Sequence, residues 1–144
     1  MSDANDNPDP AGVFLGIDHP AVAADDVDEL AAWYCATLGY AKVFRNDKPV
    51  WLLRAADGTL LEIMPRDQTP RPQRTTWTPG WSHLAIRVQD FEAAERFLRQ
   101  CRVAWCGDTA SAVGGGKVRS FFDPEGNLLQ IVERAGATGQ ETAS

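Results

Sequence analysis

The sequence predicts an α+β fold of two tandem βαβββ modules, whose strands form a cupped mixed sheet. Two observations predict this fold. A turn followed by a short apolar strand occurs twice, as DGTLLEIM at residues 57–64 and as EGNLLQIV at residues 125–132. Each half also carries one histidine ahead of a helix-starting aspartate, at His19 and at His83. One such turn and strand alone would indicate only a hairpin, whereas its recurrence indicates a duplicated structural unit.

The chain divides into a polar leader, two modules joined by a linker, and a polar tail. The leader is rich in Asp, Asn and Pro, lacks hydrophobic periodicity and is expected to be disordered. The two modules and the proline-rich linker form one domain at residues 13–134, and the tail is expected to be flexible. In chain order, these segments are residues 1–12, 13–64, 65–79, 80–134 and 135–144.

The first module is predicted from its apolar spacing. The apolar stretch 13–24 predicts a strand, which Pro20 restricts to a sheet edge or a bulge. Asp25 or Asp26 is expected to cap the following helix, Asp26 with Glu29 resembles a capping box, and Gly39 ends that helix. The inward helix face is then predicted to be Val27, Leu30, Ala31, Tyr34 and Leu38, and three strands follow at residues 41–45, 50–55 and 59–64.

The second module repeats this order. A strand is predicted at residues 81–88, and Asp90 caps a helix behind it. Gly114–Gly116 is expected to form either a plain turn or a mobile lid, and no Lys-Ser or Lys-Thr follows it as in a phosphate loop. The predicted inward helix face is Phe91, Ala94, Phe97 and Leu98, and the remaining strands are predicted at residues 103–106, 117–122 and 127–133.

Charge and cysteine content exclude several classes of function. The net charge of −6 disfavours binding to a phosphate backbone, so no nucleic-acid partner is expected. No apolar run is long enough for a membrane span, and the first residues lack the pattern of a signal peptide. The three cysteines, without CxxC spacing, are typical of reduced thiols in a cytoplasmic protein.

Four polar side chains occupy equivalent places in the two halves and form the candidate site. They are His19 and His83 on the first strands, with Glu62 and Gln130 on the fourth strands. If the modules pair about a pseudo-twofold axis, all four can line one cavity. Two imidazoles and one carboxylate suit Fe(II), Mn(II), Ni(II), Co(II) or Zn(II). Taken singly, each histidine has a structural alternative and Glu62 can face solvent by strand alternation.

The residues that carry chemistry also carry a family resemblance. The chain resembles the vicinal oxygen chelate superfamily of glyoxalases, extradiol dioxygenases and bleomycin-resistance proteins. The resembling stretches are residues 17–19, 33–39, 83–88 and 122–132, of which the Asp-Pro-Glu-Gly-Asn turn at 123–127 is the most specific. The resemblance implies paired βαβββ modules, metal ligands at His19, Glu62, His83 and Gln130, a small-molecule substrate, and a homodimer that completes two sites.

The sequence departs from this family at Gln130, where most metal-binding members resembling it carry glutamate. A glutamine amide can bind a metal through oxygen but cannot act as a base at neutral pH. Either Glu62 is then the base, or the reaction abstracts no proton. The predicted activity is a metal-dependent lyase, isomerase or dioxygenase reaction on vicinal oxygens. The alternative is a protein of the bleomycin-resistance type that sequesters a ligand, because five tryptophans and an acidic charge suit a cationic aromatic molecule.

Overall fold

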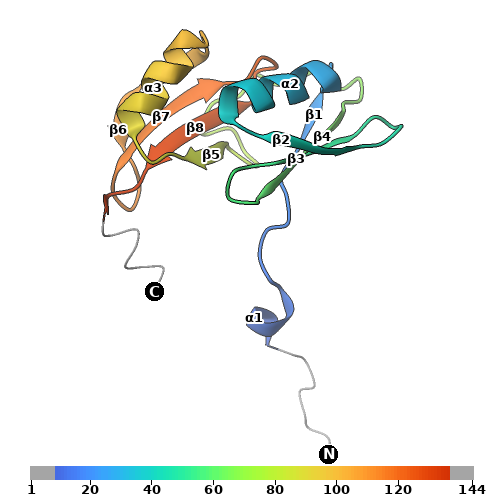
Figure 1. Ribbon diagram of the computed structural model, residues 1–144, viewed down its shortest axis with the longest axis horizontal. Coiled ribbons are helices and arrows are strands. Elements are labelled where there is room, and N and C mark those ends of the chain that lie inside the picture. Colours follow the sequence, from blue (N-terminus) through green and yellow to red (C-terminus); the bar gives the residue numbers. More distant parts are fainter. Residues whose placement is uncertain (1–8, 137–144) are drawn as a thin grey trace, which may run out of the picture.

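The computed structural model describes residues 9–136, and its elements repeat the order βαβββ (Figure 1). A one-turn helix, α1 (Pro10–Val13), precedes the first module. The first module contains β1 (Ala21–Ala24), α2 (Val27–Leu38), β2 (Ala41–Arg45), β3 (Trp51–Arg54) and β4 (Leu60–Pro65). The second contains β5 (Leu84–Arg87), α3 (Phe91–Gln100), β6 (Ala104–Ser111), β7 (Lys117–Phe122) and β8 (Leu128–Glu133). Residues 1–8 of the predicted leader and 137–144 of the predicted tail lie outside the described residues.

The strands form two four-stranded sheets with the same topology. The order is β1-β4-β3-β2 in the first sheet and β5-β8-β7-β6 in the second. In each sheet the first strand pairs in parallel with the fourth, and the other pairs are antiparallel. The predicted α+β fold of two βαβββ modules is confirmed, with one mixed sheet in each module.

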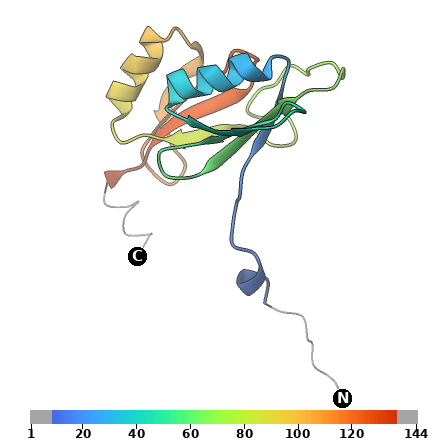
Figure 2. The same ribbon diagram turned by 45° about the vertical axis from the view of Figure 1, so that its right-hand side comes forward.

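The helices α2 and α3 lie on the same side of the sheets (Figures 1 and 2). Strand residues that face the helices are buried, and side chains from both modules join one hydrophobic core. Its most deeply buried strand residues are Leu53, Leu61, Ile63, Phe121, Leu129 and Ile131. Because successive side chains of a strand point to opposite faces, the residues between them lie on the face that the helices leave uncovered. We call this surface the open face.

The first strand of each module is shorter than predicted. The predicted strand at 13–24 begins only at Ala21, and Phe14, Leu15 and Ile17 before it are 75%, 102% and 91% exposed. The predicted strand at 81–88 begins only at Leu84, and Trp81 is 97% exposed. A strand at a sheet edge persists only where its partner strand supplies hydrogen bonds, and apolar composition alone does not set that length.

Several local predictions are confirmed and others need correction. Gly39 ends α2 with φ +74°, and Asp90 caps α3 as predicted. Phe97 is 47% exposed, so the predicted α3 face is only partly inward. The strand expected at 103–106 extends to Ser111 through an irregular register after Cys106. The Gly114–Gly116 segment lies in a turn, in which the Gly115 N–H donates to the carbonyl of Ala112 at 2.9 Å, and the Arg134 guanidinium donates to the carbonyls of Val113 and Gly115.

The Asp-Pro-Glu-Gly-Asn turn joins the two modules. Buried Asp123 accepts a hydrogen bond from the Tyr34 hydroxyl of α2 at 2.9 Å. Glu125 accepts from the backbone N–H groups of Asp25 and Asp26 at 2.7 and 3.0 Å. Asp26 caps α2 as predicted, but its own N–H is held by Glu125 and not by Glu29, so the predicted capping box is wrong. Sequence spacing could not find this partner, because it comes from the other module.

The hydrogen bonds from the N–H groups of Asp25 and Asp26 to Glu125 predict an effect on stability. Glu125→Ala should lower the free energy of unfolding by about 1–2 kcal/mol, because two backbone donors at the start of α2 lose their acceptor. Glu29→Ala should stay within about 0.5 kcal/mol, since that side chain is exposed and does not close the box. Urea unfolding followed by circular dichroism measures both changes. Equal losses for the two variants would contradict the assignment of the cap to Glu125.

Candidate functional site

Strand register places the four predicted metal ligands in equivalent positions. In the first sheet Ala21 of β1 lies opposite Glu62 of β4, and in the second sheet Ala85 of β5 lies opposite Gln130 of β8. His19 and His83 each precede that alanine by two positions, just before their strands begin. The prediction that the histidines lie near the centre or end of the first strands is therefore wrong in detail, since His19 lies two residues before β1 and His83 directly precedes β5.

In the first module the histidine and the carboxylate are in contact. His19 Nε2 lies 3.3 Å from Glu62 Oε2, and the two side chains are 32% and 29% exposed. Glu62 stands between the buried Leu61 and Ile63 on β4, so strand alternation directs it to the open face. A carboxylate in this half-buried position is paired with the imidazole rather than left in an apolar strand without a partner.

Asp18 is a site residue that the sequence interpretation missed. Its Oδ2 lies 2.7 Å from His19 Nδ1, on the side of the ring opposite to Glu62. The hydrogen bond that His19 donates to Asp18 raises the pKa of His19, burial opposes that rise, and the charge of Glu62 adds to it. A carboxylate that holds Nδ1–H leaves Nε2 as the ring nitrogen able to bind a ligand. The available signal was the Asp-His pair itself, since an acid beside a histidine can orient its ring.

The contact with Asp18 predicts a change in the titration of His19. Asp18→Asn should lower the pKa of His19, because the anionic hydrogen-bond partner that stabilises the imidazolium is replaced by a neutral one. The chain has two histidines, so proton NMR of the imidazole Cε1–H signals resolves both across a pH series. The His83 signals act as the reference in the same spectra. An unaltered titration midpoint for His19 would contradict the role given to Asp18.

In the second module the two candidate metal ligands, His83 and Gln130, contact hydroxyl groups and no carboxylate. His83 is exposed, and its Nδ1 lies 2.8 Å from the hydroxyl of Ser82. Gln130 is half-buried on β8, and its Nε2 donates to Ser120 Oγ at 3.1 Å. Both contacts are to hydroxyl groups. The fourth strand therefore supplies a neutral amide as candidate metal ligand in the second module, where the first module supplies a carboxylate.

The described part of a single chain does not assemble a complete metal centre. Over residues 9–136, no three His, Cys, Asp or Glu side chains gather closely enough to hold a metal ion. One imidazole nitrogen and one carboxylate oxygen, from His19 and Glu62, meet in the first module. These donors fit Mn(II), Fe(II), Co(II), Ni(II) or Zn(II) by type, but two protein ligands are fewer than such a centre needs.

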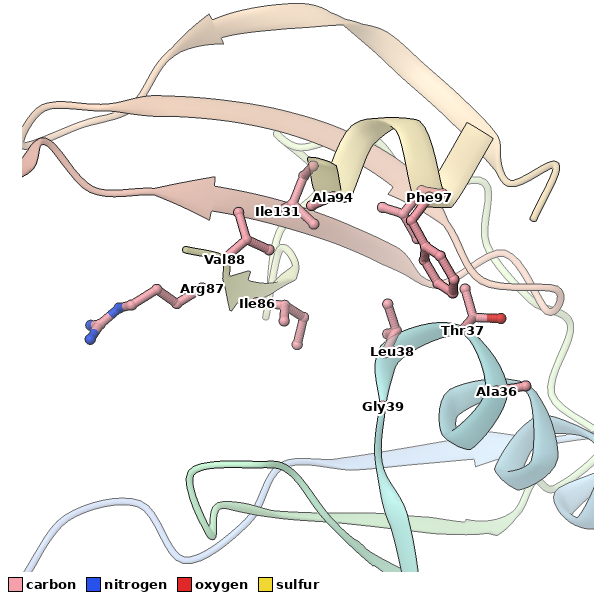
Figure 3. A pocket seen from close by; sticks show the side chains of 11 residues that line it. Ala36, Thr37, Leu38, Gly39, Ile86, Arg87, Val88, Ala94, Phe97 and Ile131 are labelled. Carbon is pink, nitrogen blue, oxygen red and sulfur yellow. The ribbon is translucent and has the colours of Figure 1, made fainter. Parts of the chain in front are cut away.

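An apolar cavity of about 350 Å³ lies elsewhere, between the modules (Figure 3). Leu38 at the end of α2, Phe97 of α3 and Ile86 of β5 are among its lining residues. None of the four donor residues lines it, and Figure 3 shows the Arg87 side chain extending away from the other labelled side chains. We interpret this cavity as a packing gap between the two helices and β5.

Three of the five tryptophans have packing roles, and two do not. Arg119 stacks 4.0 Å over the ring of Trp105 while donating to Glu95, and Arg45 lies 5.8 Å from the ring of Trp51. Trp33 packs edge-on against Tyr34 in the core. Trp77 and Trp81, both in the loop between the modules, are instead 89% and 97% exposed.

The fold and the paired donors define a class of two-module α+β proteins with polar groups on an open sheet face. The sequence profile of the Glyoxalase/Bleomycin resistance protein/Dioxygenase superfamily matches residues 16–131. The chain therefore belongs to this superfamily, as the sequence resemblance predicted. No curated protein sequence matches the chain significantly. Within residues 9–136, no helix has both the length and the apolar character needed to cross a membrane.

Solved structures share the fold at low sequence identity. A glyoxalase/dioxygenase from Nostoc punctiforme is 18% identical with a TM-score of 0.73, over 92% of this chain and 99% of that one. The fosfomycin resistance protein FosX from Listeria monocytogenes, complexed with Mn(II) and sulfate, is 15% identical with a TM-score of 0.70, over 91% and 99%. Lactoylglutathione lyase from Agrobacterium tumefaciens is 17% identical with a TM-score of 0.63, over 82% and 92%. At these identities the likeness concerns the fold.

Proposed function

We propose that this protein is a metal-dependent enzyme of the glyoxalase or dioxygenase type that acts on a small substrate through vicinal oxygens. The observation that carries the proposal is the contact of His19 Nε2 with Glu62 Oε2 at 3.3 Å, on the open face. A carboxylate and an imidazole that meet through their ligating atoms suit a divalent metal. Membership of the superfamily and the fold shared with the Mn(II) complex of FosX support the same function.

His19, Glu62, His83 and Gln130 are the residues that would hold the metal. A bound divalent ion would supply Lewis-acid stabilisation of negative charge on substrate oxygen. Glu62 is the one member of this set with a carboxylate, so it alone can take a proton from the substrate near neutral pH. Gln130 orients or binds through its amide oxygen and does not move a proton. The substrate determines whether the reaction is that of a lyase, an isomerase or a dioxygenase.

We propose that a homodimer completes the site. β1 and β5 are edge strands, and His19 and His83 each stand just ahead of one of them. Pairing β1 with the second module of a partner copy would bring the His19–Glu62 pair toward a second imidazole and amide. The arrangement explains why a single chain gathers only two of the donors. We place the dimer in the cytoplasm, since the three cysteines are free thiols.

Metal analysis tests this proposed function. The protein is purified without chelators or an affinity metal, and its metal content is measured by plasma mass spectrometry. Binding of Mn(II), Fe(II), Co(II), Ni(II) and Zn(II) to the apoprotein is then measured by titration calorimetry. The loaded protein is assayed with hemithioacetal, catechol and phosphonate substrates. A protein that binds none of the five metals would overturn the proposal.

A ligand-sequestering function of the bleomycin-resistance type is the second candidate. Trp77 and Trp81 favour it, because two nearly fully exposed indoles can stack on a flat cationic ligand. His83→Ala separates the two functions. Loss of metal binding in this variant supports the enzyme. Retained binding of both metal and an aromatic cation such as bleomycin supports the sequestering protein.

A further inference from the structure

The cross-strand neighbours of the two candidate ligands on the open face differ between the modules. On β7, Ser120 lies directly opposite Gln130 of β8. At the equivalent place in the first module, Leu52 of β3 lies directly opposite Glu62 of β4. Residues opposite each other on antiparallel strands have their side chains on the same face and close together. The Gln130 amide therefore has a polar cross-strand neighbour, Ser120. The Glu62 carboxylate has an apolar one, Leu52.

The contact between Ser120 and Gln130 constrains a side chain that has two different ends. Gln130 Nε2 donates to Ser120 Oγ at 3.1 Å, and both side chains are half-buried. An amide can bind a cation only through its oxygen, and its NH₂ group then needs an acceptor elsewhere. Glu62 faces no such requirement, because its two oxygens are both acceptors and either one can meet a metal or the His19 ring.

We propose that Ser120 is a positioning residue, which accepts a hydrogen bond from Gln130 Nε2 and thereby turns Gln130 Oε1 toward the cation site. The presence of a cation in this inference rests on the proposed function. The orientation of the amide rests on the observed contact between Gln130 and Ser120. Leaving a half-buried NH₂ group without an acceptor is unfavourable, so the hydrogen bond favours one amide orientation over the flipped one. The serine proton remains available to a substrate oxygen.

The experiment compares Ser120→Ala with Ser120→Thr, using Ser111→Ala as the matched control. Ser111 is exposed at the end of β6, outside the site. By titration calorimetry with Mn(II), we expect Ser120→Ala to weaken binding roughly 10-fold, the lower end for loss of a group that orients a ligand. Ser120→Thr keeps the hydroxyl and should restore wild-type affinity, and Ser111→Ala should leave it unchanged.

A second readout does not depend on metal. In the apoprotein, NMR of the Gln130 side-chain NH₂ should show shifted signals and faster hydrogen exchange in Ser120→Ala, and wild-type signals in Ser120→Thr. Ser120→Ala should also add nothing to the loss caused by Gln130→Ala, because the two residues act on one ligand atom. Unaltered Gln130 signals in Ser120→Ala, or unaltered Mn(II) affinity, would overturn the proposal. If the wild-type protein does not bind Mn(II) but Ser120→Ala shows the expected NMR change, the proposed function is refuted while the orientation of the Gln130 amide by Ser120 is retained.

Discussion

Glu62→Gln is expected to weaken divalent-metal binding by more than about 100-fold, because even residues that only orient ligands cost 10–100-fold. The substitution keeps the shape of the side chain and removes its charge. It leaves two imidazoles and two amides, which are weaker ligands for a divalent ion than a set with a carboxylate. Turnover should fall by about 10² to 10⁴, since no member of the set can then act as a base. Calorimetric titration with Mn(II) gives the first value, and assay of the loaded variant gives the second.

Gln130→Glu provides the complementary variant. Combined with Glu62→Gln, it moves the carboxylate from the first module to the second while keeping the total charge. Metal affinity should recover in this double variant, because one carboxylate is again present beside two histidines. The Ser120 hydroxyl can donate to the new carboxylate, so its contact is preserved. Wild-type metal affinity in the single variant Glu62→Gln would rule out Glu62 as a ligand.

The fold could be predicted because the repeated segment contains most of the local information. On both fourth strands the polar residue, Glu62 or Gln130, is half-buried between two buried apolar neighbours, as the doubled sequence predicts. Helix caps at Asp26 and Asp90 depend on the next few residues, so the sequence found them as well. Both kinds of signal are local in the chain, and the repeat provides each of them twice.

Features that depend on contact between modules could not be predicted. Glu125 holds the N-terminus of α2 although Glu29 has the sequence spacing of a capping box. The segment around Leu15 has the composition of a strand but pairs with no strand among residues 9–136. In both cases the deciding group is far away along the sequence or absent from the single chain. Local propensity is then overruled by tertiary pairing.

The candidate site is predicted in part for the same reason. Equivalent strand register places His19 by Glu62, and relates His83 to Gln130 in the same way, as the repeat implied. The sequence did not indicate that Asp18 would orient His19 or that Ser120 would hold Gln130, since these contacts depend on side-chain geometry. Assembly of the four donors depends on a second copy in our proposal, and pattern within one chain cannot specify it.

The second large effect is expected at Asp123, the residue through which the turn before β8 contacts α2. Asp123→Ala should lower the free energy of unfolding by about 3–5 kcal/mol, because one buried and three half-buried hydrogen bonds lose their shared acceptor. Asp123 Oδ2 accepts from the Tyr34 hydroxyl at 2.9 Å and from Asn127 Nδ2 at 2.7 Å. Its Oδ1 accepts from the backbone N–H groups of Glu125 and Asn127, both at 2.9 Å.

Two further variants separate the turn from the contact between modules. Tyr34→Phe removes one donor and keeps the buried ring, so it should cost about 1–2 kcal/mol. Asp108→Ala on the exposed part of β6 should stay within about 0.5 kcal/mol and controls for loss of a carboxylate. Urea unfolding followed by tryptophan fluorescence measures all three. If Asp123→Ala costs no more than Tyr34→Phe, the Tyr34 contact accounts for the whole effect and the turn itself contributes little. If it costs the full amount, the same carboxylate stabilises both the turn before β8 and the contact between the two modules.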